Sequence, residues 1–498
     1  MLQGCTVKNK LGLFLIAPGL LAGCAQLTPE IPMPASTRQG WQQELDRMQI
    51  EPVSGSLTLE EAIARGLKYN LDRRSKQLEQ DIASGQFESS LQDLLPKIKG
   101  QADRSLRSND RLTKNSNGTP TNISSDRNHT VQEFGASWSI LDFGVGYYSA
   151  KQAREKIQIA NERRRKLIHT LIQDIRSAYW RAACAQAMRE NLRKTIIEAE
   201  TALEDSRKIE SERVRTPTES LAYQKQLLES LRTLEMIDQE LAPAQVELAA
   251  LINTPSGQRL HLQSPWPTSS TTLDTPIERL ETLALEGNAD LREALHQSRI
   301  ARDETRKVMG KLFPNLSFNI AAKYDTDSYQ VHQHWNEAGL QLSFNLMNLF
   351  TGPAQMRLAD AGVQLADQRR MVMQMAVLTQ VHLGRLNWLN AQKQAQRAEQ
   401  IWSVDDRLAT LANAREKALM RGRLETVNAQ ASALLSQFRR YQAVAQVQVA
   451  ESRLRAVLGL EFDGAEVDTL ALHEVIQKVK AIVPLSHLSV KGVGHAPG

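Results

Sequence analysis

The 498-residue sequence has little of the residue types that interrupt or crosslink a chain. It contains 26 glycines, 17 prolines and 3 cysteines. Three cysteines cannot form a disulfide framework, and their positions have no zinc-binding spacing. Glycine and proline together fall below their usual share of about 12%, so we expect the chain to run in long uninterrupted elements, mostly helices.

An excess of charge of one sign is also missing. The chain carries 61 Lys and Arg against 56 Asp and Glu, a net charge of +5. This balance gives no reason to expect nucleic acid or another polyanion as a partner. Hydrophobic residues make up 41% and charged residues 23% of the sequence, which excludes both a polytopic helical membrane protein and a wholly disordered chain.

Motifs of catalysis are missing as well. The sequence has no glycine-rich phosphate loop, no nucleophile elbow, no His-Glu-x-x-His and no Cys-x-x-Cys. His332 and His334 are metal-capable types, but they have no third ligand nearby and are interpreted as loop residues. We therefore expect no enzyme activity, no cofactor and no metal.

The N-terminus resembles a bacterial lipoprotein signal. Lys8 and Lys10 precede an apolar stretch that ends in Leu21-Ala22-Gly23-Cys24, and this stretch is shorter than the ~20 residues of a spanning helix. The resemblance implies that residues 1–23 are a signal peptide and that Cys24 becomes the lipidated N-terminus of a linker over 24–56. No Asp follows Cys24 directly, as in lipoproteins sent to the outer membrane. The alternative is an ordinary signal peptide or a short buried helix.

The remainder of the chain is duplicated, with repeats expected at 57–260 and 261–460. The first matches share an offset of 218 and the later ones an offset of 206. The change in offset falls in the polar insert Ser105–Asn128, which we expect to be a loop. The matched segments are Asn70-Leu71-Asp72 with Asn288-Ala289-Asp290, Leu94-Leu95-Pro96 with Leu312-Phe313-Pro314, and residues 248–252 with 454–458.

Both repeats predict the same order of elements: a helical stretch, two strands, a very long helix and a return helix. The strands, expected at about 97–106, 131–141, 315–325 and 336–347, alternate apolar and polar residues. The helical stretches are Leu57–Leu94, opened by a cap-like Thr58, and Pro276–Phe313. The long helices are expected from Tyr147 to Thr216 and from Pro353 to Arg421, and Pro243 is expected to bend or shorten the first return helix.

Strands of this length with one apolar face suit a lipid-facing, water-lined barrel. Four strands are too few to close one, and an open sheet edge in lipid would leave backbone groups unpaired. The barrel must therefore be shared between identical chains. Three or four copies would both close it geometrically.

These features together resemble the TolC family of outer-membrane efflux channels over about Leu57–Leu460. The resemblance rests on the duplicated order of elements, on the repeated Asn-x-Asp segments, on the hairpin exits Leu141-Asp142-Phe143-Gly144 and Leu346-Met347-Asn348, and on the leucine-rich ends near Leu251 and Leu458. It implies a mostly α fold whose trimer forms a 12-stranded β-barrel, continuous with a long periplasmic α-helical barrel. It also implies an equatorial role for residues 461–498, and an adaptor protein that links the channel to an inner-membrane pump or ABC transporter.

The resemblance also implies that the tips of the helical hairpins close the tunnel and dock the adaptor. The matching residues are Val214, Arg215, Thr216, Pro217, Met420, Arg421, Gly422, Arg423 and Leu424. Glu219 and Glu425, at equivalent positions, are candidates for an acidic ring in the pore. The basic run Arg163–Lys166 is interpreted as a solvated helical face rather than a phosphate site.

Two other functions remain open from the sequence. The channel could serve a type I protein-secretion system instead of an efflux pump, since the cargo is chosen by the partners. The chain could also be a lipid-anchored periplasmic coiled-coil scaffold without a pore, although a scaffold has no need for four strands with apolar faces.

Overall fold

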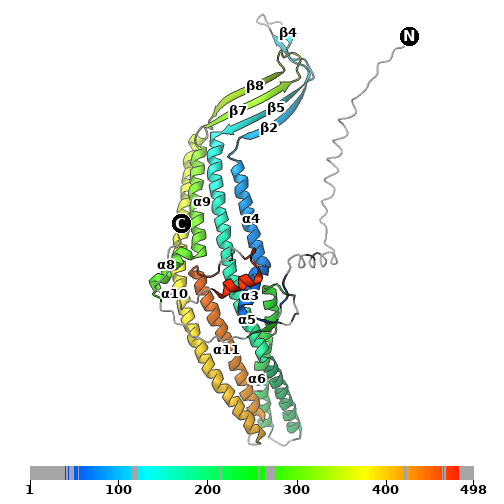
Figure 1. The fold of residues 1–498 in the computed structure, drawn as a ribbon, viewed down its shortest axis with the longest axis vertical. Coiled ribbons are helices and arrows are strands. Elements are labelled where there is room, and N and C mark those ends of the chain that lie inside the picture. The colour runs from blue at the N-terminus through cyan, green and yellow to red at the C-terminus, as the bar shows by residue number, and fades with distance from the viewer. Residues whose placement is uncertain are drawn as a thin grey trace, which may run out of the picture. The chain divides into compact units, whose positions relative to one another are not determined.

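The computed structural model describes residues 40, 43, 50–53, 55–114, 120–212, 216–255, 258, 260–263, 275–418, 423–462, 464 and 467–481. The chain divides into two compact units, Met1–Pro52 and Val53–Gly498. Cys24 and the expected signal peptide lie outside the described residues. The second unit carries all the elements discussed below (Figure 1).

The two repeats have the same elements in the same order. In the first repeat they are α3 Leu59–Tyr69, α4 Leu71–Gln92, β2 Lys97–Leu106, β5 Asn128–Ser139, α5 Ile140–Ser211, α6 Pro217–Leu241 and α7 Ala244–Leu251. In the second they are α8 Ile277–Gly287, α9 Ala289–Lys311, β7 Asn315–Asp325, β8 His334–Ser343, α10 Asn348–Lys417 and α11 Arg423–Val457. Pro243 separates α6 from α7, as expected, whereas α11 is continuous.

Both long helices begin earlier than the sequence predicted: α5 starts directly after β5, and α10 starts after the four residues that follow β8. Ser139 is the N-cap of α5, and its side chain accepts a hydrogen bond from the amide of Asp142. Gly146 is tolerated within α5 because it packs against the carbonyl of Asp93, where a Cβ would come within 3.3 Å. Pro353 lies inside α10 rather than at its start. The second strands therefore end at Ser139 and Ser343, short of the expected 141 and 347.

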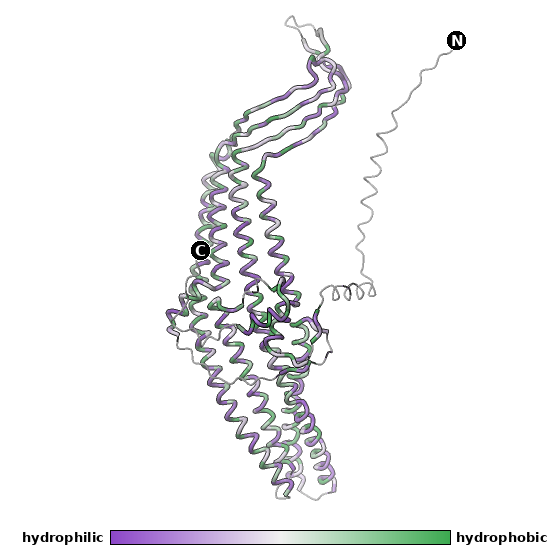
Figure 2. Tube along the Cα trace, viewed as in Figure 1, coloured by the Kyte–Doolittle hydropathy of each residue, from purple (hydrophilic) through white to green (hydrophobic). Residues whose placement is uncertain are grey.

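The four long strands form one antiparallel sheet in the order β2-β5-β7-β8. Its register places Trp138 opposite Phe318, and Phe318 opposite Leu340. The alternation of apolar and polar residues along each strand is visible in Figure 2. The apolar face is uncovered in the single chain, since Ile98 is 70% and Leu342 is 72% exposed. A surface of this kind needs an apolar environment.

The polar insert is partly ordered instead of being a simple loop. β3 Leu112–Lys114 pairs with β4 Pro120–Ile123 as a short antiparallel hairpin. Close by, Asp327 accepts a hydrogen bond from the amide of Asp126, and Asp126 accepts one from the amide of Ser328. These reciprocal bonds tie the strand-connecting loops of the two repeats to each other.

The repeated Asn-x-Asp segments mark a break in each first helical stretch. Asn70 and Asn288 are the N-caps of α4 and α9, and their side chains accept from the amides of Arg73 and Leu291. Each asparagine also donates to a carbonyl at the end of its own return helix. The acceptors are Leu251 at 3.3 Å and Val457 at 3.1 Å. One side chain therefore caps a helix and fastens that helix to the end of its repeat.

The end of each return helix turns at a residue with positive φ. Asn253 has a φ of 54° and Gly459 a φ of 71°, and the two positions are equivalent in the duplication. The Asn253 side chain donates to the carbonyl of Tyr69. At the corresponding place in the second repeat, Gly459 approaches Gly287 so closely that a Cβ on Gly459 would lie 2.3 Å from the Gly287 carbonyl. Glycine is required here by both backbone conformation and space.

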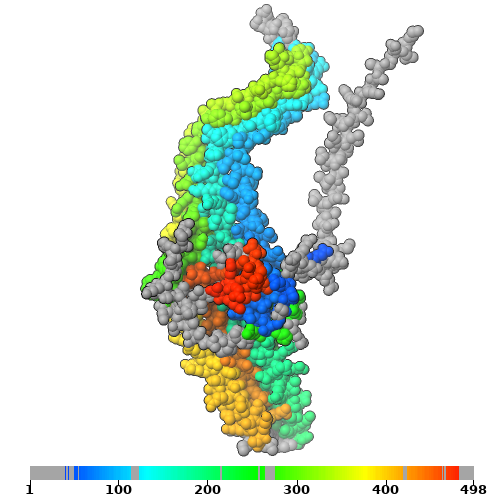
Figure 3. Space-filling model, viewed as in Figure 1, coloured from blue at the N-terminus to red at the C-terminus, as the bar shows by residue number. Residues whose placement is uncertain are grey.

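A C-terminal strap connects the end of the second repeat to the first. Helix α12, Leu472–Lys480, packs on α3, and the two lie together in Figure 3. Before it, Asp468 forms a bidentate ion pair with Arg73, whose side chain is fully buried. Burial opposes the charge of Asp468, but the Arg73 guanidinium outweighs it and lowers the pKa of that carboxyl. The strap thus fixes the C-terminal end of the described chain to α3 and α4 of the first repeat.

The middle of the helical region contains another connection, which involves residues near the start of the second unit. β1 Ser56–Leu57 pairs in parallel with β6 His261–Leu262, which follows the first repeat. The buried hydroxyl of Tyr179 donates to the carbonyl of Leu57 and contacts the carbonyl of Gln263. Burial raises the pKa of Tyr179, so its hydroxyl keeps its proton and continues to donate to the carbonyl of Leu57.

Candidate functional site

The first hairpin turn lies at the ends of α5 and α6. Thr216 is the N-cap of α6, and its hydroxyl donates to the carboxylate of Glu219 at 2.9 Å. Pro217 is the first residue of α6, a position that suits its fixed φ. Glu219 is exposed. Val214 and Arg215 lie outside the described residues.

The second hairpin turn is described from Arg423 onwards; Met420, Arg421 and Gly422 are not among the described residues. Arg423, at the start of α11, lies 3.6 Å from the carboxylate of Asp205 on α5. Leu424 packs against an apolar cluster that includes Leu227 and Val427. The Arg423–Asp205 pair therefore connects the two hairpins close to their turns. Sequence analysis selected Arg423 but missed Asp205, because nothing in the spacing of the chain links the two.

Glu219 and Glu425 are in different surroundings despite their equivalent positions. Glu219 is engaged with the cap of its own helix, whereas Glu425 is half-buried and has a partner of its own. Their arrangement as a ring would require several copies of the chain, so the acidic ring stays a prediction.

The helices near the turns are packed with small and hydroxyl-bearing side chains. Ser220 on α6 and Thr426 on α11 are equivalent positions, each 2% exposed, and neither hydroxyl has a hydrogen-bond partner within the described part of the chain. Leu424 and Val427 flank Thr426 and join these residues to the apolar cluster that contains Leu203 and Leu227. Buried hydroxyls without a hydrogen-bond partner lower the stability of a helical bundle at the point where they lie, so these two positions make the region near the turns easier to open.

The basic run Arg163–Lys166 is a solvated face only in part, since Arg163 and Lys166 are exposed whereas Arg164 and Arg165 are largely covered. Arg163 pairs with Glu293 and Lys166 with Asp290, both at 2.7 Å and both on α9. Arg164 is buried against Gln77 on α4, and Arg165 donates to the carbonyl of Gly459. The run therefore connects α5 of the first repeat to α9 of the second repeat, and to the turn that follows α11. The hydrogen bond from Arg163 to Glu293 raises the pKa of that guanidinium.

More ion pairs continue this seam between α5 and α9. Glu162, only 2% exposed, accepts from Arg292 at 2.9 Å, and Glu155 contacts His296 at 2.6 Å. Toward the strands, Lys151 lies 3.3 Å from the buried carboxylate of Asp303. The two repeats are held together here by polar pairs instead of a continuous apolar core.

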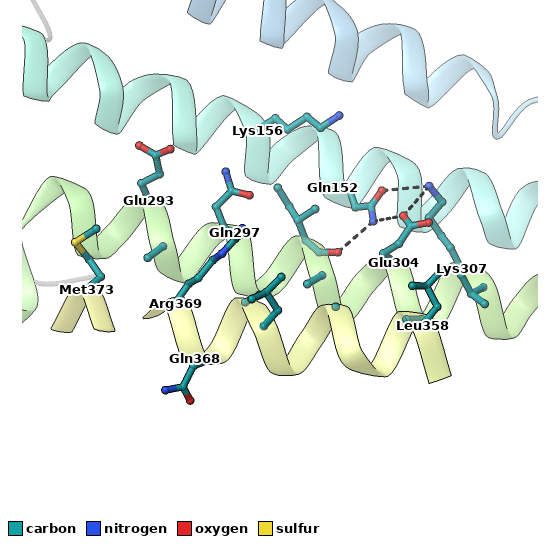
Figure 4. A pocket seen from close by; sticks show the side chains of 18 of the residues that line it. Gln152, Lys156, Glu293, Gln297, Glu304, Lys307, Leu358, Gln368, Arg369 and Met373 are labelled. Carbon is teal, nitrogen blue, oxygen red and sulfur yellow. Dashed lines mark hydrogen bonds and ion pairs between the residues drawn. The ribbon is translucent and has the colours of Figure 1, made fainter. Parts of the chain in front are cut away.

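A groove of about 1330 Å³ lies along α5, α9 and α10 (Figure 4). One wall is polar, where Gln152 bonds to Glu304 and Lys307. The hydrogen bond from Gln152, together with Lys307, lowers the pKa of Glu304. The other wall is formed by α10 and includes Leu358 and other apolar residues.

The edge helices α4 and α10 carry exposed apolar stripes. On α10, Leu358, Leu365 and Val372 follow at seven-residue intervals and are 76%, 52% and 62% exposed. On α4, Leu78 and Ile82 are each 61% exposed. Apolar residues at this spacing are the pattern by which helices pack side by side on further helices.

The described part of the chain offers no site for metal chemistry: no group of three or more His, Cys, Asp or Glu side chains there is arranged to hold an ion. Cys184 is buried, and burial raises the pKa of its thiol to about 12, so it is unreactive. None of the described helices is both long and apolar enough to cross a lipid bilayer.

Residues 63–254 match the model of the outer membrane efflux protein family. The match lies within the first repeat and covers less than half of the chain. It confirms the resemblance seen in the sequence, and the second repeat is an internal copy of the first. Proteins of this family are channels and not enzymes, and the match indicates a bacterial outer-membrane location with a periplasmic part.

Several solved structures share the fold of this chain. A membrane protein from Pseudomonas aeruginosa has a TM-score of 0.64 at 15% identity, covering 83% of this chain and 92% of that one. The Campylobacter jejuni CmeC outer membrane channel has a TM-score of 0.64 at 12% identity, covering 86% and 90%. The open state of the Neisseria gonorrhoeae MtrE channel has a TM-score of 0.60 at 16% identity, covering 82% and 94%. No curated protein sequence matches this chain.

Proposed function

We propose that the protein is the exit duct of a tripartite efflux pump, in which three copies form a 12-stranded barrel continuous with a periplasmic helical barrel. The observation that supports this best is the uncovered apolar sheet face, whose edge strands β2 and β8 have no outer partner strand within the described part of the chain. A periplasmic adaptor and an inner-membrane pump or ABC transporter would supply cargo and energy. The same duct would serve a type I protein-secretion system if the inner-membrane partner selected a protein.

The sheet edges are suited to ring closure. β2 and β8 are the two edges of an antiparallel four-stranded sheet, so they run in opposite directions. β8 of one copy can therefore pair antiparallel with β2 of the next, and identical copies close without a mismatch in direction. In lipid, each unpaired backbone group would cost several kcal/mol, which strongly favours closure. The family resemblance selects three copies.

Opening of the tunnel is proposed to occur at the hairpin tips. Val214, Arg215, Thr216, Pro217, Met420, Arg421, Gly422, Arg423 and Leu424 are the proposed docking surface for the adaptor. The Arg423–Asp205 pair would hold the two hairpins together in the resting state, and the unsatisfied buried hydroxyls of Ser220 and Thr426 would lower the cost of separating them. An adaptor that binds the separated hairpins more tightly would shift the population toward the open state.

The Arg423–Asp205 pair, which we call the tip pair, gives a direct test of both conduction and gating. In planar bilayers we expect Asp205→Asn to raise the open fraction severalfold, because each copy loses an exposed pair worth about 0.2–1 kcal/mol and the copies open together. Arg423→Gln should have the same effect. The double variant should add little to either, since both remove the same contact.

The control is Glu198→Gln, which breaks a pair between half-buried Glu198 and exposed Lys194 within α5. Its open fraction should stay at the wild-type value. Conductance that is unchanged in the Asp205 and Arg423 variants would remove the tip pair from the mechanism. Absence of any conductance from the assembled protein would favour the periplasmic scaffold.

Lipidation of Cys24 is a separate part of the proposal. Growth with radiolabelled palmitate should label the wild-type protein but not Cys24→Ser, and the mature wild-type protein should have lost residues 1–23 by mass. A wild-type protein that is cleaved but unlabelled would show an ordinary signal peptide instead.

A further inference from the structure

The polar face of the sheet carries a continuous row of charged and amide side chains. Gln101 donates to the carboxylate of Glu133 at 3.3 Å. The ammonium of Lys323 lies 3.8 Å from the same carboxylate and 2.8 Å from that of Glu337. We call these four residues the charge belt. Each of the four strands of the large sheet contributes one member.

The register places the charge belt on the face opposite the apolar one. Gln101 stands opposite Glu133, and Glu133 opposite Lys323. These are odd-numbered positions, whereas Trp138, Phe318 and Leu340 are even-numbered, and successive side chains of a strand point to opposite faces. A sheet that turns its apolar face to lipid must turn the charge belt inward.

Most other inward-facing positions of the strands are small or neutral. Examples are Gly135, Ser137, Asn319, Gly339 and Gln341. The other charged odd-numbered positions of the four strands are two cations and two carboxylates, which cancel: Lys97, Lys99, Asp103 and Asp325. In each copy the belt therefore holds two carboxylates and one ammonium, with Lys323 between the carboxylates.

We propose that the charge belt sets the charge preference of the barrel for permeating ions and cargo, and that Lys323 limits its negative charge. The inference rests on the proposed function, because it requires the polar face to line a water-filled lumen. Charges that line a channel with low-dielectric walls concentrate counter-ions in it. Removing Lys323 exposes both carboxylates, and removing both carboxylates leaves only the ammonium.

The test is the zero-current potential across a planar bilayer in a KCl gradient. Lys323→Met should raise the K⁺ to Cl⁻ permeability ratio severalfold, and the double variant Glu133→Gln with Glu337→Gln should lower it. Both shifts should be large near 0.01 M salt, where the Debye length is about 30 Å, and small at 1 M, where it is about 3 Å. Lys323→Arg, which keeps the charge, should retain the wild-type ratio.

The control for net charge is Lys76→Met on α4. Lys76 pairs with Glu79 at 2.7 Å, so this variant also removes one cation beside a carboxylate, but outside the strands. A shift as large as that of Lys323→Met would overturn the assignment to the belt. Normal conductance with an unchanged permeability ratio in every belt variant would also overturn the assignment. Absence of conductance in every protein, including the wild type, would instead reject the proposed channel.

Discussion

Replacing Leu365 and Val372 on α10 with glutamate is expected to abolish assembly and conductance. Both side chains are more than half exposed in the single chain, so the substitutions remove little from its own core. In a closed ring the α10 stripe would be buried against α4 of the next copy. Burial of each such side chain is worth about 1.5–3 kcal/mol, and an unpaired carboxylate there would add a desolvation cost.

The two levels of structure can be measured separately. Circular dichroism of the variant should show wild-type helix content, while sedimentation or native mass spectrometry should show monomers. The matched control is Gln364→Glu, which adds a charge at the exposed neighbouring position and should leave assembly intact. A Leu365, Val372 variant that still forms the same oligomer and conducts would show that α10 is not the contact between copies.

The sequence allowed the broad architecture to be predicted because its signals are local. Alternation of apolar and polar residues identifies each strand, and the long stretch without glycine or proline after Tyr147 identifies a long helix. The duplication then added evidence, since the same order of elements occurs twice. The short hairpin β3–β4 was missed because strands of three and four residues are too short to show a period.

Contacts between distant segments could not be predicted. The Arg163–Lys166 run has the composition of a solvated face, and only the fold brings α9 beside it, 130 residues away for Arg163 and Glu293. The pairing of Asp205 with Arg423 could not be predicted for the same reason. At the tips the sequence identified the turns but not which side chain connects them.

Asn70 and Asn288 illustrate both sides of this limit. Their repetition was evident in the sequence, and their role as caps could be read from residue type. Their second bonds, to carbonyls 181 and 169 residues away, could not. Because one side chain satisfies groups on two helices, its loss should have an unusually large effect on stability.

Asn288→Leu is therefore expected to lower the free energy of unfolding by about 2–4 kcal/mol, combining a lost N-cap with a buried carbonyl left unpaired. Asn288→Ser keeps a capping oxygen but cannot reach Val457, so its loss should be about half as large. Denaturant titration in detergent, followed by circular dichroism, measures both variants against the wild type. If Asn288→Ser lowers the free energy of unfolding as much as Asn288→Leu, the whole effect belongs to the bond with Val457. If both variants stay within about 0.5 kcal/mol of the wild type, the range of ordinary surface substitutions, the junction is held by the Gly287–Gly459 contact instead.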